Sequence, residues 1–365
     1  MTEQDEAGRG GELAGDEMRY RHVIQAVAER PWAMHPDTLA VIVDLLRYRS
    51  AGHRLTRAEV DERIASGQER FAAARGRATK TGAGGAVAVL PLFGVIAPRA
   101  AAFQSVSSPN GTGVDAFTQM FRQALADPSV GSILIEVDSP GGQVGGIPEL
   151  AAEIRGSRGD KPIVAIANFR AASAAYWIAS QADELVLPPS GEVGSVGVYA
   201  AHEDLSGKLE QDGVKMTLVS AGKYKVEGNP FEPLSEEARA AIQADVDAFY
   251  AMFVSDVAKG RGVSVEDVRT GFGEGRMVMA AQAVKAGMAD RVATFDETVA
   301  RLARGEAPAA KPRALADAVA AEKNAADDPR QNDPEGGTPS TLDHVADAER
   351  LLAYDAVREA FPTRA

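Results

Sequence analysis

Short apolar runs alternate with amphipathic stretches through the middle of the chain. Between the runs, apolar residues recur at helical spacing, and strands that are apolar on both faces and separated by helices indicate a largely parallel sheet covered on both sides. The pattern therefore predicts an α/β domain over residues 86–295. The predicted strands are Ala86–Ile96, Ser132–Val137, Pro162–Ala167, Glu184–Leu187 and the MTLVS run Met216–Ser220. The predicted helices contain Phe117 to Leu125, Ile147–Arg155, a short stretch from Ser173, and Leu234–Gly260 with a Ser235 cap.

The segments on either side of this domain have different patterns. Residues 1–17 hold few large apolar groups and are expected to be disordered, whereas residues 18–75 show helical spacing. The glycine-rich residues 76–85 are expected to be a linker, and so are the Ala- and Pro-rich residues 303–340. Apolar positions return in residues 341–361, which predicts a terminal helix.

Composition and charge exclude several classes of function. The net charge of −13 disfavours sequence-independent binding to nucleic acid and to anionic membranes. The chain has no cysteine, so disulfides, zinc–thiolate sites, iron–sulfur clusters and thiol nucleophiles are excluded. The acidic N-terminus does not resemble a secretory signal, and the apolar stretch Thr38–Leu46 is far shorter than the ~20 residues of a membrane-spanning helix. We expect a cytoplasmic protein without membrane, nucleic acid, metal or cofactor.

A glycine-rich motif follows the second predicted strand. The residues Asp138–Gly146 read DSPGGQVGG, and glycines at the carboxyl end of a parallel strand let backbone amides point into a crevice. The motif lacks the G-x-G-x-x-G and G-x-x-x-x-G-K-[ST] patterns of nucleotide-binding loops. A tight turn and an anion hole for a carbonyl oxygen remain as interpretations.

A serine stands where the third strand gives way to a helix. In FRAASAAYWIAS, Ser173 has alanine on both sides, and a hydroxyl at a helix start lies beside free amides that can stabilise an oxyanion. The alternative is a simple N-cap serine. A nucleophilic serine also needs a base, and His202 is the one histidine of the predicted domain. The loop AGKYKVEGNP offers Lys223 and Lys225, because a lysine acts as a base when burial lowers its pKa from about 10.4 towards neutrality.

Taken in order, DSPGGQVGG, FRAASAAYWIAS, GEVGSVGVY and AGKYKVEGNP resemble the signal peptide peptidase A family of serine peptidases. The resemblance covers about Val87 to Val292 and includes the trailing GEGRMVMAAQAVKAGMADRV. It implies the Clp-protease/crotonase-like fold, a spiral of βαβ repeats, and a Ser-Lys dyad that works through an acyl-enzyme.

The resemblance also assigns roles to individual residues. Ser173 takes the place of the nucleophile, and Lys225, which lies 52 residues later and five before Pro230, takes the place of the general base, with Lys223 as the alternative. Ser195 takes the place of the serine that orients the lysine amine. The oxyanion hole then comes from Gly141, Gly142 and the amide of Ala174.

Departures from the membrane-bound members favour one branch of the family. The chain shows no N-terminal anchor, and its helical N-terminal segment and acidic C-terminal tail resemble phage head maturation proteases, in which the protease is joined to a scaffolding region. We therefore expect a protease that cleaves scaffold or head proteins in the host cytoplasm or prohead, a homo-oligomeric ring whose neighbours complete the site, and a terminal helix that binds coat protein or packs on its own core. The alternatives are a host cytoplasmic peptidase, an enoyl-CoA hydratase-like enzyme and a non-catalytic assembly scaffold.

Overall fold

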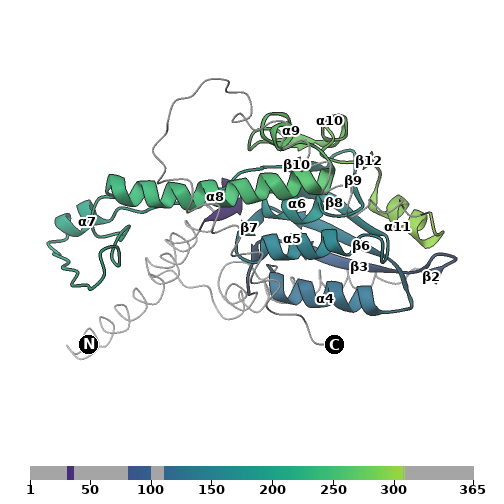
Figure 1. The fold of residues 1–365 in the computed structure, drawn as a ribbon, viewed down its shortest axis with the longest axis horizontal. Coiled ribbons are helices and arrows are strands. Elements are labelled where there is room, and N and C mark those ends of the chain that lie inside the picture. Colours follow the sequence, from purple (N-terminus) through teal and green to yellow (C-terminus); the bar gives the residue numbers. More distant parts are fainter. Residues whose placement is uncertain (1–30, 37–80, 100–110, 307, 309–365) are drawn as a thin grey trace, which may run out of the picture. The chain divides into compact units, whose positions relative to one another are not determined.

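A twisted, mostly parallel sheet forms the centre of the protein (Figure 1). The structure, a computed structural model, describes residues 31–36, 81–99, 111–306 and 308. The strand order is β11-β10-β8-β6-β3-β2, with β9 beside β8 and β12 beside β9. The strands are β2 (Thr81–Gly82), β3 (Gly85–Phe93), β6 (Val130–Ser139), β8 (Ile163–Ala172), β9 (Glu184–Leu187), β10 (Glu192–Gly194), β11 (Met277–Met279) and β12 (Arg291–Val292).

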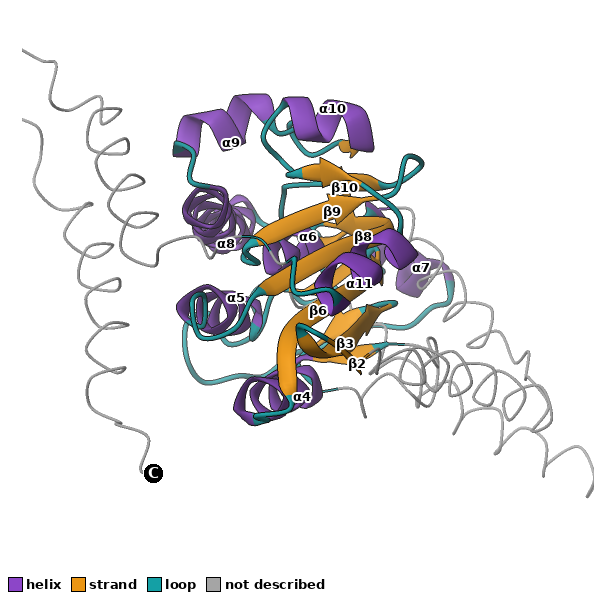
Figure 2. Ribbon diagram, turned by 90° about the vertical axis from the view of Figure 1, so that its right-hand side faces the viewer, coloured by secondary structure: helices purple, strands orange, loops and turns teal. Residues whose placement is uncertain are grey.

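Helices cover both faces of this sheet (Figure 2). One face carries α4 (Val114–Ala126), α5 (Ile147–Gly156), α6 (Ala174–Ala179) and α8 (Glu236–Arg261). The opposite face carries α11 (Phe295–Ala303). The remaining helices are α7 (Ser206–Gln211), α9 (Val265–Gly271) and α10 (Ala280–Lys285).

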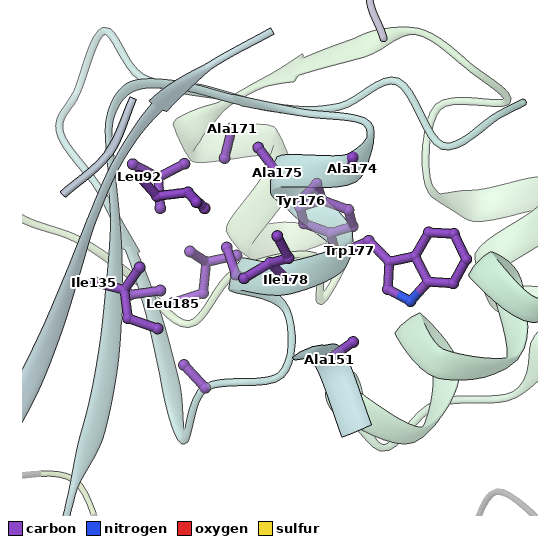
Figure 3. Packing of buried hydrophobic residues seen from close by; sticks show 14 of the residues in the cluster. Leu92, Ile135, Ala151, Ala171, Ala174, Ala175, Tyr176, Trp177, Ile178 and Leu185 are labelled. Atoms are coloured by element: carbon purple, nitrogen blue, oxygen red, sulfur yellow. The ribbon is translucent and has the colours of Figure 1, made fainter. Parts of the chain in front are cut away.

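Two apolar clusters hold these layers together because β3, β6 and β8 are apolar on both faces. The larger cluster lies under α4, α5, α6 and α8, and within it Trp177 of α6 stacks on Phe253 of α8 with ring centroids 4.5 Å apart. Figure 3 shows Trp177 pointing away from the strands that carry Leu92 and Ile135. The smaller cluster joins the other face of the sheet to Phe295, Val299 and Leu302 of α11.

The long strand β8 has two neighbours on one edge. Its first half pairs with β9, and its last residues, Arg170–Ala172, pair in parallel with β10. The other edge of β8 pairs with β6 over most of its length. The carboxyl end of β8 is therefore enclosed by the carboxyl ends of β6 and β10.

A second, four-stranded sheet lies beyond that end, in the order β1-β7-β4-β5. Its strands are β1 (Trp32–Met34), β4 (Ile96–Ala97), β5 (Thr112–Gly113) and β7 (Gly141–Gln143). Strand β7 directly follows the end of β6, and β1 pairs with it in antiparallel register although it comes from a distant part of the chain.

Much of the predicted architecture is confirmed. The α/β class with a parallel sheet is present, as the signal peptide peptidase A resemblance implied, and β9 has the predicted bounds. The predicted long helix is α8, and the hydroxyl of Ser235 accepts a hydrogen bond from the amide of Ala238 at its start. The ordered domain extends further than predicted, because α11 packs on the sheet through Ala303.

Other predictions were wrong. The MTLVS run is not a strand, because no strand of the described chain lies beside it, and its Val219 is 94% exposed. The predicted first strand is broken into β3 and β4 at Gly94, which has φ 64°. Thr81–Gly82 of the predicted linker pairs with β3 as a hairpin. Within the predicted N-terminal helical segment, Trp32–Met34 is a strand, because Pro31 and Pro36 flank it and its backbone pairs with β7.

Other expectations lie outside the described residues. These are the disorder of residues 1–17, the terminal helix 341–361 and most of the segments 18–75 and 303–340.

We expect Phe253→Ala to lower the free energy of unfolding by about 3–5 kcal/mol, because it removes a fully buried ring stacked on Trp177. Phe249→Ala is the matched control on the same helix, and its loss should be smaller because Phe249 is only partly buried. Urea denaturation of the full chain measures both. Equal losses for the two variants would contradict this account of the core.

Candidate active site

Two serines stand side by side at the carboxyl ends of neighbouring parallel strands. Ser173 follows β8 and Ser195 follows β10, and the strands are in register with Gly194 opposite Ala172. The amide of Ser173 donates to the carbonyl of Gly194 at 2.7 Å. The structure thus brings together the nucleophile and the orienting serine that the sequence predicts.

The backbone of both serines is in an unusual conformation. Ser173 has φ 54° and Ser195 has φ 52°, a region that residues with a side chain rarely adopt. Such strain persists only where surrounding structure holds it, and it gathers at active sites. One interaction that stabilises this conformation at Ser195 is the hydrogen bond from its amide to the carbonyl of Arg276, at 2.9 Å.

The hydroxyl of Ser173 is not used as a helix cap. Ser173 is the N-cap residue of α6, yet its side chain makes no capping hydrogen bond. The contact that its Oγ makes, with the carbonyl oxygen of Gly197, is long at 3.4 Å. The simple N-cap interpretation therefore fails, because the start of the helix does not engage the hydroxyl.

The glycine motif forms the strand β7 beside these serines. The amide of Gly141 donates to Oγ of Ser139 at 3.1 Å, and that hydroxyl donates to the carbonyl of Gly94 at 2.6 Å. Gly142 is packed against the backbone of Ile96 so closely that no side chain fits there. Ser139 therefore positions the glycine strand, a role that the sequence analysis missed although Ser139 lies inside the motif.

The amides predicted for the oxyanion hole differ in what they contact. The amide of Gly141 already donates a hydrogen bond to Oγ of Ser139. Gly142 faces the neighbouring strand β1. Ala174 opens α6 directly after Ser173, so its amide adjoins the hydroxyl. Gly142 and Ala174 are the two candidate donors that this arrangement leaves.

The lysines of the predicted base loop are not beside Ser173 in this chain. Lys225 lies in the turn between α7 and α8, and Figure 1 shows α7 and this turn at the end of α8 that is remote from β8 and β10. Lys225 is exposed. Between residues 201 and 252 only Ala238 is buried, so the whole segment, which we call the arm, projects from the core.

The neighbouring Lys223 is held as a cation. Its ammonium donates to the hydroxyl of Tyr224 at 2.6 Å and to the carboxylate of Glu237 at 3.0 Å. These hydrogen bonds, to Tyr224 and then to Glu237, raise the pKa of Lys223. A lysine stabilised in its charged form is a poor general base, which favours Lys225 of the two.

The histidine alternative also lies on the arm. Nε2 of His202 is 3.2 Å from the carbonyl oxygen of Asn229, and the ring thus ties two parts of the arm together. Within the described part of one chain, His202 therefore does not form a Ser-His-Asp triad with Ser173.

A cavity of about 300 Å³ adjoins the glycine strand at Pro140. It contains an ion pair between Arg170 and Glu192, whose Nε and Oε1 atoms are 2.8 Å apart. The complete lining is Asp138, Pro140, Phe169, Arg170, Ser190 and Glu192.

Among the described residues, no group of three or more His, Asp or Glu side chains could hold a metal ion. In the same part of the chain, every helix is too short or too polar to cross a bilayer.

Residues 156–308 match peptidase family S49, and this range contains Ser173, Ser195 and Lys225. The glycine strand β7 precedes the matched range, so its place beside Ser173 and Ser195 is a finding of the structure.

Several known proteins resemble this chain. The head-tail preconnector protein GP5 of Enterobacteria phage P21 is 36% identical over 217 residues, which cover 60% of this chain and 42% of that protein. Capsid assembly protease C of Escherichia phage lambda is 34% identical over 213 residues, which cover 58% of this chain and 48% of that protein. The chain thus spans somewhat less than half the length of these two relatives.

One solved structure that resembles it is that of a mutant of the 1510-N membrane-bound stomatin-specific protease in complex with a substrate peptide. It has a TM-score of 0.34 and 17% sequence identity, and the match covers 58% of this chain and 77% of that one.

We expect Ser139→Ala to slow the reaction of Ser173 with a fluorophosphonate probe by about fivefold, because one hydrogen bond that positions β7 is worth about 1 kcal/mol. The kcat for a peptide substrate should fall while KM changes little. Ser132→Ala is the matched control, since its hydroxyl is buried on the same strand and has no hydrogen-bond partner in the described chain. Equal effects of the two changes would contradict a positioning role.

Proposed function

We propose that this chain is a serine endopeptidase in which Ser173 is the nucleophile and Lys225 the general base. The observation that carries the proposal is the state of Ser173. Its hydroxyl does not cap α6, its backbone is strained, and it lies beside Ser195 within the range that matches family S49. Strained serines at a strand-to-helix junction present their hydroxyl to a substrate carbonyl.

The proposed reaction is acyl transfer. The amine of Lys225 takes the proton of Ser173 while Oγ attacks the peptide carbonyl, and the amine of the leaving peptide then receives that proton. The amides of Gly142 and Ala174 stabilise the oxyanion that forms on the way. Water hydrolyses the acyl-enzyme in the second half of the reaction and restores the hydroxyl of Ser173. Ser195 orients the lysine amine.

The base comes from a neighbouring copy of the chain in this proposal. Lys225 lies on the projecting arm, away from β8 and β10 of its own chain, so a second copy can bring it to Ser173. The arm also exposes large apolar side chains, which a partner surface would cover. They are Val214, Met216, Val219 and Tyr224. In a closed ring, every copy would supply its Lys225 to one neighbour and receive the Lys225 of another.

The proposed substrates are phage scaffold or head proteins. This proposal rests on the similarity to capsid assembly protease C of phage lambda and to the preconnector protein of phage P21. It places the protein in the host cytoplasm and the prohead during assembly. The expected coat-binding role of the terminal segment belongs to the same proposal.

Replacing either member of the dyad should abolish cleavage of a capsid substrate. Ser173→Ala removes the nucleophile, and Lys225→Ala removes the base, so each should lower kcat/KM by at least about a thousandfold. Lys223→Ala should retain activity, because its ammonium is bound to Tyr224 and Glu237. If Lys223→Ala is inactive and Lys225→Ala is active, the base has been assigned to the wrong lysine.

Mixing the two inactive variants tests whether the site is shared between copies. Co-assembled Ser173→Ala and Lys225→Ala chains should regain up to about a quarter of wild-type activity, because one active site then needs one copy of each kind side by side. Size-exclusion chromatography with light scattering establishes that the mixture has assembled. An assembled mixture without activity would show that Lys225 does not act across the interface.

A further inference from the structure

Strand β1 is held along both of its backbone edges. On one edge it pairs with β7, in the register Trp32 to Gln143, Ala33 to Gly142 and Met34 to Gly141. On the other edge, the amide of Trp32 donates to the Tyr199 carbonyl at 2.7 Å, and the amide of Tyr199 donates back at 3.0 Å. Figure 1 shows this purple segment beside β7. We call the backbone of β7 and that of Tyr199, which hold β1 from its two sides, the strand site.

The register places the backbone of Ala33 opposite Gly142, which is a candidate donor of the oxyanion hole. The amide of His35 donates to the carbonyl of Pro140 at 2.9 Å. Along two antiparallel strands, residue pairs that exchange hydrogen bonds alternate with pairs that do not. His35 and Pro140 form a pair of the first kind, so Ala33 and Gly142, two residues away on each strand, form the next one. The carbonyl of Ala33 therefore faces the amide of Gly142, as the carbonyl of a substrate would.

The same carbonyl lies close to the nucleophile. A methyl group built on Gly141 would overlap the carbonyl oxygen of Ala33 and would lie 3.0 Å from that of Ala172, the residue before Ser173. The peptide between Ala33 and Met34 thus passes next to Ser173. With β1 in this position, Ser173 has 0% exposure. A substrate cannot reach a nucleophile that is fully buried.

The conformation of β1 is the one in which extended peptides are recognised. Peptides that add a strand to a sheet gain main-chain hydrogen bonds and place alternate side chains on opposite sides. Here the small side chain of Ala33 belongs to the main core cluster. Pro31 and Pro36 limit the pairing to a short stretch because proline lacks an amide donor. A short strand is held by few backbone hydrogen bonds, so a competing peptide has mainly to replace the buried side chains of Trp32, Ala33 and Met34.

We propose that β1 is an internal occupant of the substrate-binding strand site, which keeps Ser173 covered until β1 leaves. The proposal builds on the proposed peptidase function, because it identifies the strand site as the place where an extended substrate binds. An incoming peptide then competes with Trp32–Met34 for β7 and Tyr199.

The first test measures the rate at which a fluorophosphonate probe labels Ser173 in the full chain. Ala33→Pro removes the backbone amide that donates to Gly142, so β1 should leave the strand site more often. Labelling should then become at least about fivefold faster, which corresponds to the loss of one backbone hydrogen bond. Ala33→Gly keeps that amide and serves as the control, with labelling at no more than about twice the wild-type rate. Circular dichroism melting shows whether each variant is folded.

The second test does not depend on catalysis. A fluorescent peptide with the sequence RPWAMHP should bind folded Ala33→Pro at least about tenfold more tightly than wild type, because in wild type β1 already fills the strand site. The same peptide N-methylated at its alanine lacks the donor for β7 and should not bind. If Ala33→Pro does not fold, Trp32→Ala replaces it, since this change keeps every amide and removes a fully buried side chain of β1.

The outcomes separate the two proposals. If a folded variant labels at the wild-type rate and fails to bind the peptide, β1 is a fixed part of the domain and the occupant proposal is wrong. If the peptide binds as expected while Ser173 is never labelled, the strand-site proposal stands and the peptidase proposal fails. Cleavage of the chain between Ala33 and Met34, read by intact mass, would support the placement of that peptide at the nucleophile.

Discussion

The candidate site depends on the parallel pairing of β6, β8 and β10. Because β8 changes its neighbour from β9 to β10 part-way along, its last residues are enclosed on both edges. The chain must turn sharply where these strands end, and Ser173 and Ser195 make that turn in the left-handed region. The cost of this conformation is met by the packing around α6, whose residues are all buried. The geometry of the candidate site is thus a property of the core.

The sequence predicted those parts of the fold that depend on local patterns. Apolar runs located the central strands, and the Ser235 cap located the start of α8. The serines could be found because each lies in a motif of small residues next to a recognisable strand. Ser139 shows the limit of this approach, because its role depends on Gly94, a residue 45 positions away that becomes its neighbour only in the folded sheet.

The remaining differences have the same physical origin. An isolated run such as MTLVS has strand composition, but a strand needs a partner edge, and the described chain offers none. Conversely, Trp32–Met34 lies in a segment of helical spacing and becomes a strand because two distant backbone edges hold it. The resemblance alone led to the prediction of Lys225 as the base, with Lys223 as the alternative, and it gave no indication that this loop lies away from β8 and β10 in one chain.

The attachment of α11 decides where the domain can be divided. Glu184 of β9 forms ion pairs with Arg291 and with Arg301 of α11, and the glycines of the β2–β3 hairpin pack on the carboxyl end of the same helix. The sequence pattern places the end of the domain at residue 295. An expression fragment that stopped there would lack almost all of α11, so Val87, Val89 and Leu134 on that face of the sheet would be exposed to water. Shortened forms of this protein should therefore retain the chain to at least Glu306, or they will tend to aggregate through that bared side.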